Sequence, residues 1–413
     1  MPAQKTRQRV GIEKIRAYPC SCGLDLRELA RVRGEDPDHP TKLLMMDWRG
    51  VNPAWEDPVT MAVNAAKPML TEQDLASIEL LIVGTESSAD QGKPISTFVH
   101  SHLGIQPNCR NFEVKHACYG GTCAAMAAAH WVASGVAGPA KALVIGTDMS
   151  RMNLGERYEY LMGSGAVALL ISAEPKVVEF ELETNAYWTR EVGDTFRPTS
   201  REEAGNTDES LYAYLEGLDG AYAHFKRKNG FDYDARFGQH IYHVPFSAMS
   251  YRAHRNILKR ESRMKRAEIE ARCERKVAPS LTHSRKFGGI YTAANYIGLM
   301  GTIDAAPDLQ PGDHISIYSY GSGSGAELYS VTLCPEAKQV VGAARLGELI
   351  AARRPLAVAE YEACERERTS YVDVATFQPR RDRVPGLYES HYAGRGLLVL
   401  EGYEGYFRHY GWS

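Results

Sequence analysis

Three runs of apolar residues in the first half of the chain lack the alternation of polar and apolar residues that marks a strand with one solvent-exposed face. They are "IELLIVGTE" (Ile78–Glu86), "KALVIGTD" (Lys141–Asp148) and "GAVALLIS" (Gly165–Ser172). Continuous apolar runs of this length are typical of strands buried on both faces. Segments of helical character lie between them, including an alanine-rich stretch. The alternation predicts an α/β fold with buried strands.

The pattern starts again in the second half of the chain with "KVVEFELETNAY" (Lys176–Tyr187). Further on, "QHIYHVPF" (Gln239–Phe246) is strand-like, and residues 313–333 are expected to form two strands joined by a glycine turn. Two α/β halves of similar size suggest a duplicated core, although no residue-level repeat is visible. We expect the halves to span residues 1–174 and 175–413.

Charge and cysteine content exclude several classes of protein. The net charge of -3 gives no overall field that would attract nucleic acid. No apolar run is long enough to cross a membrane, and the N-terminal residues lack the apolar core of a signal peptide. The eight cysteines include no C-x-x-C pair, which disfavours structural zinc. We therefore expect no metal site, no membrane partner and no nucleic-acid partner, and a cytoplasmic protein with reduced thiols.

One cysteine has the surroundings of a nucleophile. In "EVKHACYGGTCAAMAAAHW" (Glu113–Trp131), Cys118 precedes two glycines and the alanine-rich segment. If a strand precedes it, the thiol faces a helix N-terminus, whose N–H groups and dipole favour the thiolate and lower the thiol pKa. The alternative is a buried cysteine that acts as a small hydrophobic residue.

Two further polar residues follow strand-like runs. Glu86 ends a buried run, and ligands of open α/β sheets gather at the carboxyl ends of strands, where a carboxylate can act as a base. Its alternative is a helix cap or a surface salt bridge. His243 ends a run that Pro245 stops, although a lone histidine is more often structural. The joint presence of Cys118, Glu86 and His243 indicates a catalytic site.

A strongly basic segment occupies residues 252–276 and is predicted to be helical. One interpretation is a solvated helix face, which is the usual role of a run of charges. The other is a docking surface for an acidic partner or for phosphate groups. The residues of the segment do not decide between the two.

Motifs along nearly the whole chain resemble the hydroxymethylglutaryl-CoA synthase family of the thiolase superfamily. They are Glu56–Leu70, Glu79–Thr97, "HACYGGT" (His116–Thr122), "GAVALLIS", "HVPF" (His243–Phe246) and "SYGSGSGAELYS" (Ser319–Ser330). The resemblance implies a thiolase-like, five-layered αβαβα fold with two duplicated halves. The first half would carry Glu86 and Cys118, and the second His243, family-specific insertions and the tail.

The resemblance also implies roles for individual residues. The family's nucleophile lies in an Ala-Cys-Tyr motif that matches Cys118, its general base matches Glu86, and its acceptor-binding histidine matches His243. Ketoacyl-ACP synthases of the same superfamily are similar at the cysteine but lack that glutamate. The motifs that line the family's substrate cavity contribute Tyr119, Tyr291, Gly321 and Ser322.

The implied reaction joins two carbon atoms. Cys118 carries an acetyl thioester, Glu86 removes a methyl proton, and the enolate attacks a β-ketone whose oxygen His243 polarises or protonates. Water then releases the product. The Cys118 amide and the glycine turn near Ser322 are the expected oxyanion donors. The reaction requires no cofactor, because the substrates arrive on the phosphopantetheine of an acyl carrier protein (ACP) or on CoA.

Three motifs resemble one branch of the family more closely, the hydroxymethylglutaryl-ACP synthase-like enzymes of polyketide β-branching: "NAAKPM", "GDTFRP" (Gly193–Pro198) and "AHRN" (Ala253–Asn256). That branch adds acetate (or propionate) from a donor ACP to the β-ketone of a polyketide on an acceptor ACP. The basic segment would then contact a carrier protein or its phosphopantetheine through Arg252, His254 and Arg255. As in the superfamily, a homodimer is expected.

Two departures from the family pattern bear on the alternatives. Ala248 and Arg252 stand where CoA-using members carry lysines, which disfavours a mevalonate-pathway synthase that acts on acetyl-CoA and acetoacetyl-CoA. Gly289 stands where the family usually has an asparagine that helps to hold the acceptor. Losing one oxyanion donor typically costs about 10²–10³ in rate. Gly289 therefore leaves open a catalytically impaired scaffold, unless Asn295 substitutes for that asparagine.

Overall fold

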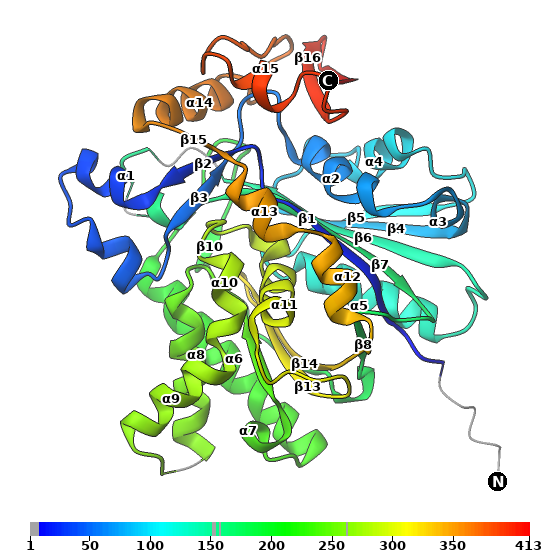
Figure 1. The fold of residues 1–413 in the computed structure, drawn as a ribbon, viewed down its shortest axis with the longest axis vertical. Helices are drawn as coiled ribbons and strands as arrows, with labels where there is room; N and C mark the ends of the chain where they lie inside the picture. The colour runs from blue at the N-terminus through cyan, green and yellow to red at the C-terminus, as the bar shows by residue number, and fades with distance from the viewer. Residues whose placement is uncertain (1–7, 151–153, 157, 262) are drawn as a thin grey trace.

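The computed structural model describes residues 8–150, 154–156, 158–261 and 263–413. Within them, ten strands form one sheet in the order β12-β13-β14-β8-β1-β7-β6-β4-β5, with β9 paired to β14. Helices cover both faces of this sheet (Figure 1). The fold is a mixed α/β fold.

The strands of the large sheet are β1 (Gly11–Tyr18), β4 (Ile78–Gly84), β5 (Arg110–Val114), β6 (Lys141–Met149), β7 (Ser164–Ser172), β8 (Val178–Phe180), β9 (Ala186–Thr189), β12 (Gln239–Tyr242), β13 (His314–Gly321) and β14 (Gly325–Leu333). Smaller sheets contain β2 (Cys22–Asp25), β3 (Trp48–Val51), β10 (Thr195–Phe196), β11 (Ala204–Gly205), β15 (Arg354–Pro355), β16 (Leu398–Glu404) and β17 (Phe407–Trp412). The helices are α1 (Leu26–Arg33), α2 (Pro58–Ala66), α3 (Glu72–Ser77), α4 (Ile95–Leu103), α5 (Gly120–Ala133), α6 (Thr207–Asn229), α7 (Tyr233–Arg236), α8 (Ala248–Glu261), α9 (Arg266–Lys276), α10 (Leu281–Ser284), α11 (Ala294–Ala305), α12 (Ala337–Ala343), α13 (Leu346–Ala351), α14 (Val358–Ser370) and α15 (Leu387–His391).

The side chains of β4 alternate between two hydrophobic cores. Leu80 and Ile82 belong to the core that contains α5, whereas Leu81 and Val83 belong to the core that contains α2 and α4. Because helices cover both faces, every position of the strand needs an apolar residue. The predicted buried strands are confirmed, since β4, β6 and β7 coincide with the three apolar runs.

The antiparallel pairing of β1 with β8 joins two groups of strands. On one side lie β1, β4, β5, β6 and β7, all from before residue 174. On the other side lie β8, β9, β12, β13 and β14, all from after it. The strands of each predicted half thus stay together, while the halves as duplicated units, 1–174 and 175–413, stay a prediction.

The second half contains the expected hairpin and helices. β13 and β14 pair antiparallel and are joined at residues 322–324, which confirms the predicted glycine turn. The basic segment is helical but is divided between α8 and α9, which pack against each other. None of the helices formed by the described residues is both long and apolar enough to span a membrane.

The carboxyl end of β4, the start of α5 and the short helix η6 (Tyr291–Ala293) meet with almost no space between them. A Cβ on Gly84 would lie 2.6 Å from the Gly120 carbonyl group, and a Cβ on Gly121 would lie 2.1 Å from the Thr292 carbonyl oxygen. Only glycine allows this approach. The contact fixes the backbone on either side of residues 86 and 118.

Replacing Gly121 with alanine should therefore destabilise the protein. Forced overpacking typically costs about 1–3 kcal/mol, because the backbone around Thr292 has to move. The urea midpoint of unfolding should fall. Gly342→Ala is the matched control, because a Cβ on this α12 residue meets nothing within 4 Å. Equal midpoints for Gly121→Ala and wild type would contradict the contact.

Candidate active site

Cys118 lies in a tight turn between β5 and α5. The Tyr119 amide donates to the His116 carbonyl oxygen over 3.0 Å, and the Gly120 amide to that of Ala117 over 3.1 Å. Ala117 has a φ of 43°, in the left-handed region that non-glycine residues rarely adopt. Cys118 is a free thiol of intermediate exposure, and α5 begins two residues after it.

The thiol of Cys118 is not activated by its position before the helix. Burial raises its pKa well above the ordinary value, and the nearby Glu86 and Asp148 carboxyl groups raise it further, while Arg197 lowers it. The prediction of a lowered thiol pKa is therefore wrong. Desolvation and three acidic neighbours, Glu86, Asp148 and Glu203, all act against the thiolate.

Glu86 follows β4 at the carboxyl end of the sheet. Its amide donates to Asp148 Oδ1 over 2.9 Å, and its carboxylate lies 3.4 Å from Arg197 Nη2. The side chain is only 14% exposed, so this ion pair is largely shielded from solvent and is not the surface salt bridge that the sequence left open. Because the charge of Glu86 acts on both Cys118 and Tyr291, the three side chains share one site.

Asp148, which sequence reasoning did not select, anchors the site. It is fully buried near the end of β6. Its Oδ1 accepts from the Thr85 hydroxyl over 3.0 Å as well as from the Glu86 amide, and its Oδ2 accepts from the Thr292 amide over 3.1 Å. Burial raises its pKa, and these hydrogen bonds oppose the rise. The polar end of the run "KALVIGTD" was the available signal.

His243 follows β12 and is nearly fully buried. The His243 amide donates to the Tyr318 carbonyl oxygen over 2.8 Å, and the His243 carbonyl oxygen accepts a hydrogen bond from the Tyr214 hydroxyl over 2.8 Å. Burial lowers the pKa of His243 to about 3, so the imidazole is neutral at pH 7. No hydrogen bond to its ring occurs within the described residues, which leaves the ring available to a ligand.

The β13–β14 turn links His243 to the cysteine. Tyr318, opposite the end of β12, is three residues before Gly321, or about 10 Å along the strand. A Cβ on Gly321 would lie 2.7 Å from the Tyr119 amide nitrogen and 2.5 Å from the His116 carbonyl oxygen. Gly321 thus lies against the Cys118 turn, and Ser322 follows it at intermediate exposure.

The Tyr119 side chain packs edge-on against the His116 ring of the same turn and is held by a buried acid. Its hydroxyl donates to Glu327 Oε2 over 2.6 Å, and the Asn185 amide donates to Glu327 Oε1 over 2.8 Å. Burial raises the pKa of Glu327 to about 7. Tyr119 therefore supports the turn through its side chain, whereas a contact with substrate stays a prediction.

Tyr291 and Gly289 lie on the segment that enters η6. Tyr291 is almost buried, with a φ of 45°, and the Arg197 guanidinium lies 5.0 Å from its ring centroid. The Gly289 amide donates to the Leu161 carbonyl oxygen over 2.6 Å, and a Cβ here would lie 2.7 Å from that oxygen. An asparagine at position 289 would therefore require Leu161 to move.

Asn295 lies beside His243. Its Nδ2 donates to the Tyr318 carbonyl oxygen over 3.3 Å, the same oxygen that accepts the His243 amide. It is buried, and its Oδ1 has no hydrogen-bond partner among the described residues. A polar side chain thus lies close to His243, whereas the role of Asn295 as the substitute for the missing asparagine stays a prediction.

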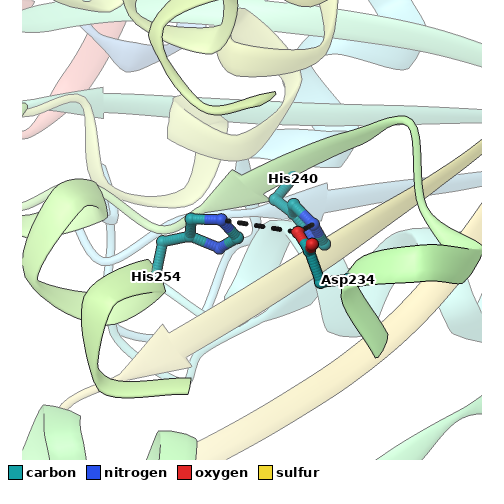
Figure 2. Close-up of side chains that lie close together, drawn as sticks. All are labelled: Asp234, His240 and His254. Carbon is teal, nitrogen blue, oxygen red and sulfur yellow. Dashed lines mark ion pairs between the residues drawn. The ribbon is translucent and has the colours of Figure 1, made fainter. Parts of the chain in front are cut away.

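His254, predicted to contact a carrier protein, is fully buried. It lies on α8, close to His240 of β12 and Asp234 of α7 (Figure 2). Its Nε2 is 4.0 Å from Asp234 Oδ1, and its Nδ1 is 3.0 Å from the Tyr242 hydroxyl. The prediction for His254 is wrong, because an apolar α8 face turns this residue inward.

The three residues of Figure 2 hold possible metal-binding atoms within 4.8 Å of one another. However, Asp234 forms ion pairs with Arg272 and with Lys276, whose Nζ lies 3.2 Å from Oδ1. A divalent cation would therefore meet two cationic side chains. These charges favour a buried polar cluster that ties α7, α8, α9 and β12 together.

Arg252 and Arg255 do reach the outer side of α8. Arg252 is exposed, and Arg255 forms an ion pair with Glu270 of α9. Between the two helices lies a cavity of about 520 Å³, lined by Arg255, Lys259, Met264, Arg266, Ile269 and Glu270. Some basic residues of this segment thus line a cavity, so the segment is more than a uniformly solvated helix face.

Comparison with known proteins gives one consistent result. Models for the N-terminal and C-terminal parts of hydroxymethylglutaryl-coenzyme A synthase match residues 6–176 and 253–393. The polyketide biosynthesis 3-hydroxy-3-methylglutaryl-ACP synthase PksG of Bacillus subtilis is 35% identical over 97% of this chain and 99% of its own. A hydroxymethylglutaryl-CoA synthase of Enterococcus faecalis is 32% identical over 86% of this chain and 91% of its own.

Solved structures agree with this result. The HMG synthase of the curacin biosynthetic pathway has a TM-score of 0.93 at 38% identity, covering 98% of this chain and 100% of its own. Its complex with a holo donor-ACP has a TM-score of 0.94 at the same identity and coverage. MvaS in complex with 3-hydroxy-3-methylglutaryl coenzyme A has a TM-score of 0.88 at 30% identity, covering 99% and 100% of the two chains.

The raised pKa of the Cys118 thiol gives a test of the site. Because the Glu86 carboxylate disfavours the thiolate, Glu86→Gln should lower the thiol pKa and shift iodoacetamide alkylation of Cys118 to lower pH. Each unit of fall raises the thiolate fraction about tenfold below the pKa. Peptide mass spectrometry separates Cys118 from the other cysteines. Glu202→Gln, at an exposed glutamate, is the control, and an unchanged pH dependence in Glu86→Gln would contradict the geometry.

Proposed function

This chain belongs to the hydroxymethylglutaryl-coenzyme A synthase family, and we propose that it is the acyltransferase of polyketide β-branching. It adds an acetyl or propionyl group from a donor ACP to the β-ketone of a polyketide on an acceptor ACP. The observation that carries the proposal is the similarity of 35–38% over nearly the full chain to PksG and to the curacin HMG synthase. The identity to relatives named hydroxymethylglutaryl-CoA synthase is 26–32%.

The first half-reaction forms the acyl-enzyme on Cys118. The Cys118 sulfur bonds to the acetyl carbonyl carbon, and the phosphopantetheine sulfur leaves as a thiol with the proton. The resting thiol has a raised pKa, so it stays protonated until a substrate enters. The amides of Cys118 and of the turn at Ser322 hold the thioester oxygen.

The second half-reaction forms the carbon–carbon bond. Glu86 takes a proton from the acetyl methyl group, and the electron pair of the broken C–H bond forms the enolate. The enolate carbon attacks the β-ketone carbon, the C=O electron pair moves to the oxygen, and the alkoxide takes up a proton while Glu86 gives up the one it removed. His243 is neutral, so it donates a hydrogen bond to the ketone oxygen as charge develops there and does not enter the step as an imidazolium. Asn295 assists in place of the asparagine missing at Gly289. Hydrolysis of the Cys118 thioester then frees the product.

The exposed basic side chains of α8 and α9 suit an acidic carrier protein. Arg252 and Lys259 of α8 and Arg266 of α9 are exposed, Arg263 is exposed in the connection between the two helices, and Arg255 is partly exposed. Such a face attracts an acidic partner and a phosphopantetheine phosphate.

A mevalonate-type enzyme would use the same catalytic residues but would take its acyl groups from CoA. A scaffold without activity is the weaker alternative, because the nucleophile, base and histidine are all present.

The finer architecture follows the family. We include in the proposal a five-layered αβαβα thiolase fold, with the buried helices α5 and α11 as its inner layer. β5 is an edge strand of the large sheet, and its exposed Phe112 suits pairing with a second copy in a homodimer. All eight cysteines are free thiols, which suits the reducing cytoplasm.

Incubation with acetyl-ACP should label the protein with one acetyl group, measured by intact mass. Cys118→Ala should abolish the label, whereas Cys123→Ala, five residues along on α5, should retain it. Faster labelling by acetyl-ACP than by acetyl-CoA is expected. Preferential labelling by acetyl-CoA would favour the mevalonate-type enzyme, and no label from either would favour the scaffold.

Charge reversal on the basic face should weaken carrier recognition. Lys259→Glu with Arg266→Glu should reduce the rate of acetyl transfer from ACP about tenfold or more at low salt, with a smaller loss at high salt. Transfer from acetyl-pantetheine, which has no carrier protein, should not change. Lys338→Glu on α12 is the control, because that lysine is exposed on a different helix. Equal losses with both donors would refute docking at this face.

A further inference from the structure

Arg197 lies between the catalytic base and a second carboxylate. It follows β10, and its side chain is only 12% exposed. Nη2 lies 3.4 Å from Glu86 Oε1 and 3.2 Å from Glu203 Oε2, and Nε donates to Glu203 over 3.2 Å. The guanidinium is therefore shared by Glu86 and Glu203.

The same side chain also holds the backbone that carries the base. Arg197 Nη1 donates to the Glu86 carbonyl oxygen over 2.8 Å and to the Ser87 hydroxyl over 3.3 Å. Its carbon centre lies 5.0 Å from the Tyr291 ring centroid, in a cation–π arrangement. The planar, forked guanidinium can make these contacts together, which an ammonium group cannot.

Acidic and neutral groups also lie close to Glu86. Asp148 of β6 faces its amide, Cys118 faces it from the turn before α5, and Tyr291 from η6. Glu203 lies on the far side of Arg197. Removing the guanidinium takes away an opposite charge 3.4 Å from the Glu86 carboxylate in a poorly solvated site, which shifts the balance towards the protonated form.

We propose that Arg197 is the positioning residue that keeps Glu86 ionised and aimed at the acyl group on Cys118. The inference rests on the proposed function. The step it serves is enolisation, in which the methyl C–H bond of acetyl-Cys118 breaks, the proton goes to a Glu86 carboxylate oxygen, and the electron pair becomes the enolate. Arg197 does not exchange a proton in this step, because its guanidinium stays charged.

Enolisation can be measured without the acceptor. The enzyme is acetylated on Cys118 from acetyl-ACP and transferred to D₂O, and mass spectrometry follows deuterium entering the methyl group. The rate should fall on the acid side, where Glu86 becomes protonated. This fall is the acid limb of the pH–rate profile. In Arg197→Gln the acid limb should move to higher pH by about one unit or more, since an opposite charge at this distance lowers a carboxyl pKa by about one unit or more. Arg197→Lys should largely restore its position.

The second carboxylate gives a change of opposite sign. Glu203→Gln leaves the charge of Arg197 less neutralised, so the acid limb should move to lower pH. Arg201→Gln, which removes an exposed ion pair with Asp373 and a hydrogen bond to the Val372 carbonyl oxygen, should leave the limb in place. Thermal melts identify any variant that fails to fold, and the Glu203 and lysine variants keep the test available if Arg197→Gln is one of them.

The outcomes separate the two proposals. If wild type takes no acetyl group, the proposed function fails. If wild type is acetylated and exchanges deuterium, but the acid limb stays fixed in Arg197→Gln and in Glu203→Gln, the role of Arg197 fails while the proposed function stands. A loss of rate that is equal at every pH would likewise refute the role in ionisation.

Discussion

The buried carboxyl group of Asp148 is the interaction on which the site depends. Burying such a group is costly unless its oxygens are hydrogen-bonded. The donors come from the segment after β4, through Thr85 and Glu86, and from η6, through Thr292. Because these segments are about two hundred residues apart in the chain, one buried group fixes the position of the base relative to the second half of the protein.

Burial also decides the protonation states at the start of the reaction. Desolvation keeps Cys118 as a thiol and His243 as a neutral imidazole. Arg197, by contrast, retains its charge between two carboxylates, and that charge opposes the rise in the Cys118 pKa. The site thus combines two neutral groups with one guanidinium shared by two carboxylates, an arrangement that suits carbonyl chemistry in a poorly solvated site.

Sequence reasoning succeeded where a signal is local or where a family motif supplied it. The strands β4, β6 and β7 were predictable because burial on both faces requires continuous apolar runs. It failed where the outcome depends on what packs nearby. His254 belongs to a basic segment, yet α8 turns it inward, and the helix start near Cys118 suggested a low thiol pKa that acidic neighbours and burial reverse. Arg197 was missed, although it stands in the quoted motif "GDTFRP".

The sequence by itself determined the α/β class, the buried strands β4, β6 and β7, and the residues proposed for the site, Cys118, Glu86 and His243. These follow from hydrophobic periodicity and from motifs that are local in the chain. Only the tertiary structure decided which distant groups meet them, namely Asp148, Arg197 and the β13–β14 turn. The reason is physical: charge and protonation are set by the neighbours within a few ångströms, and those neighbours come from strands and loops that only folding brings together.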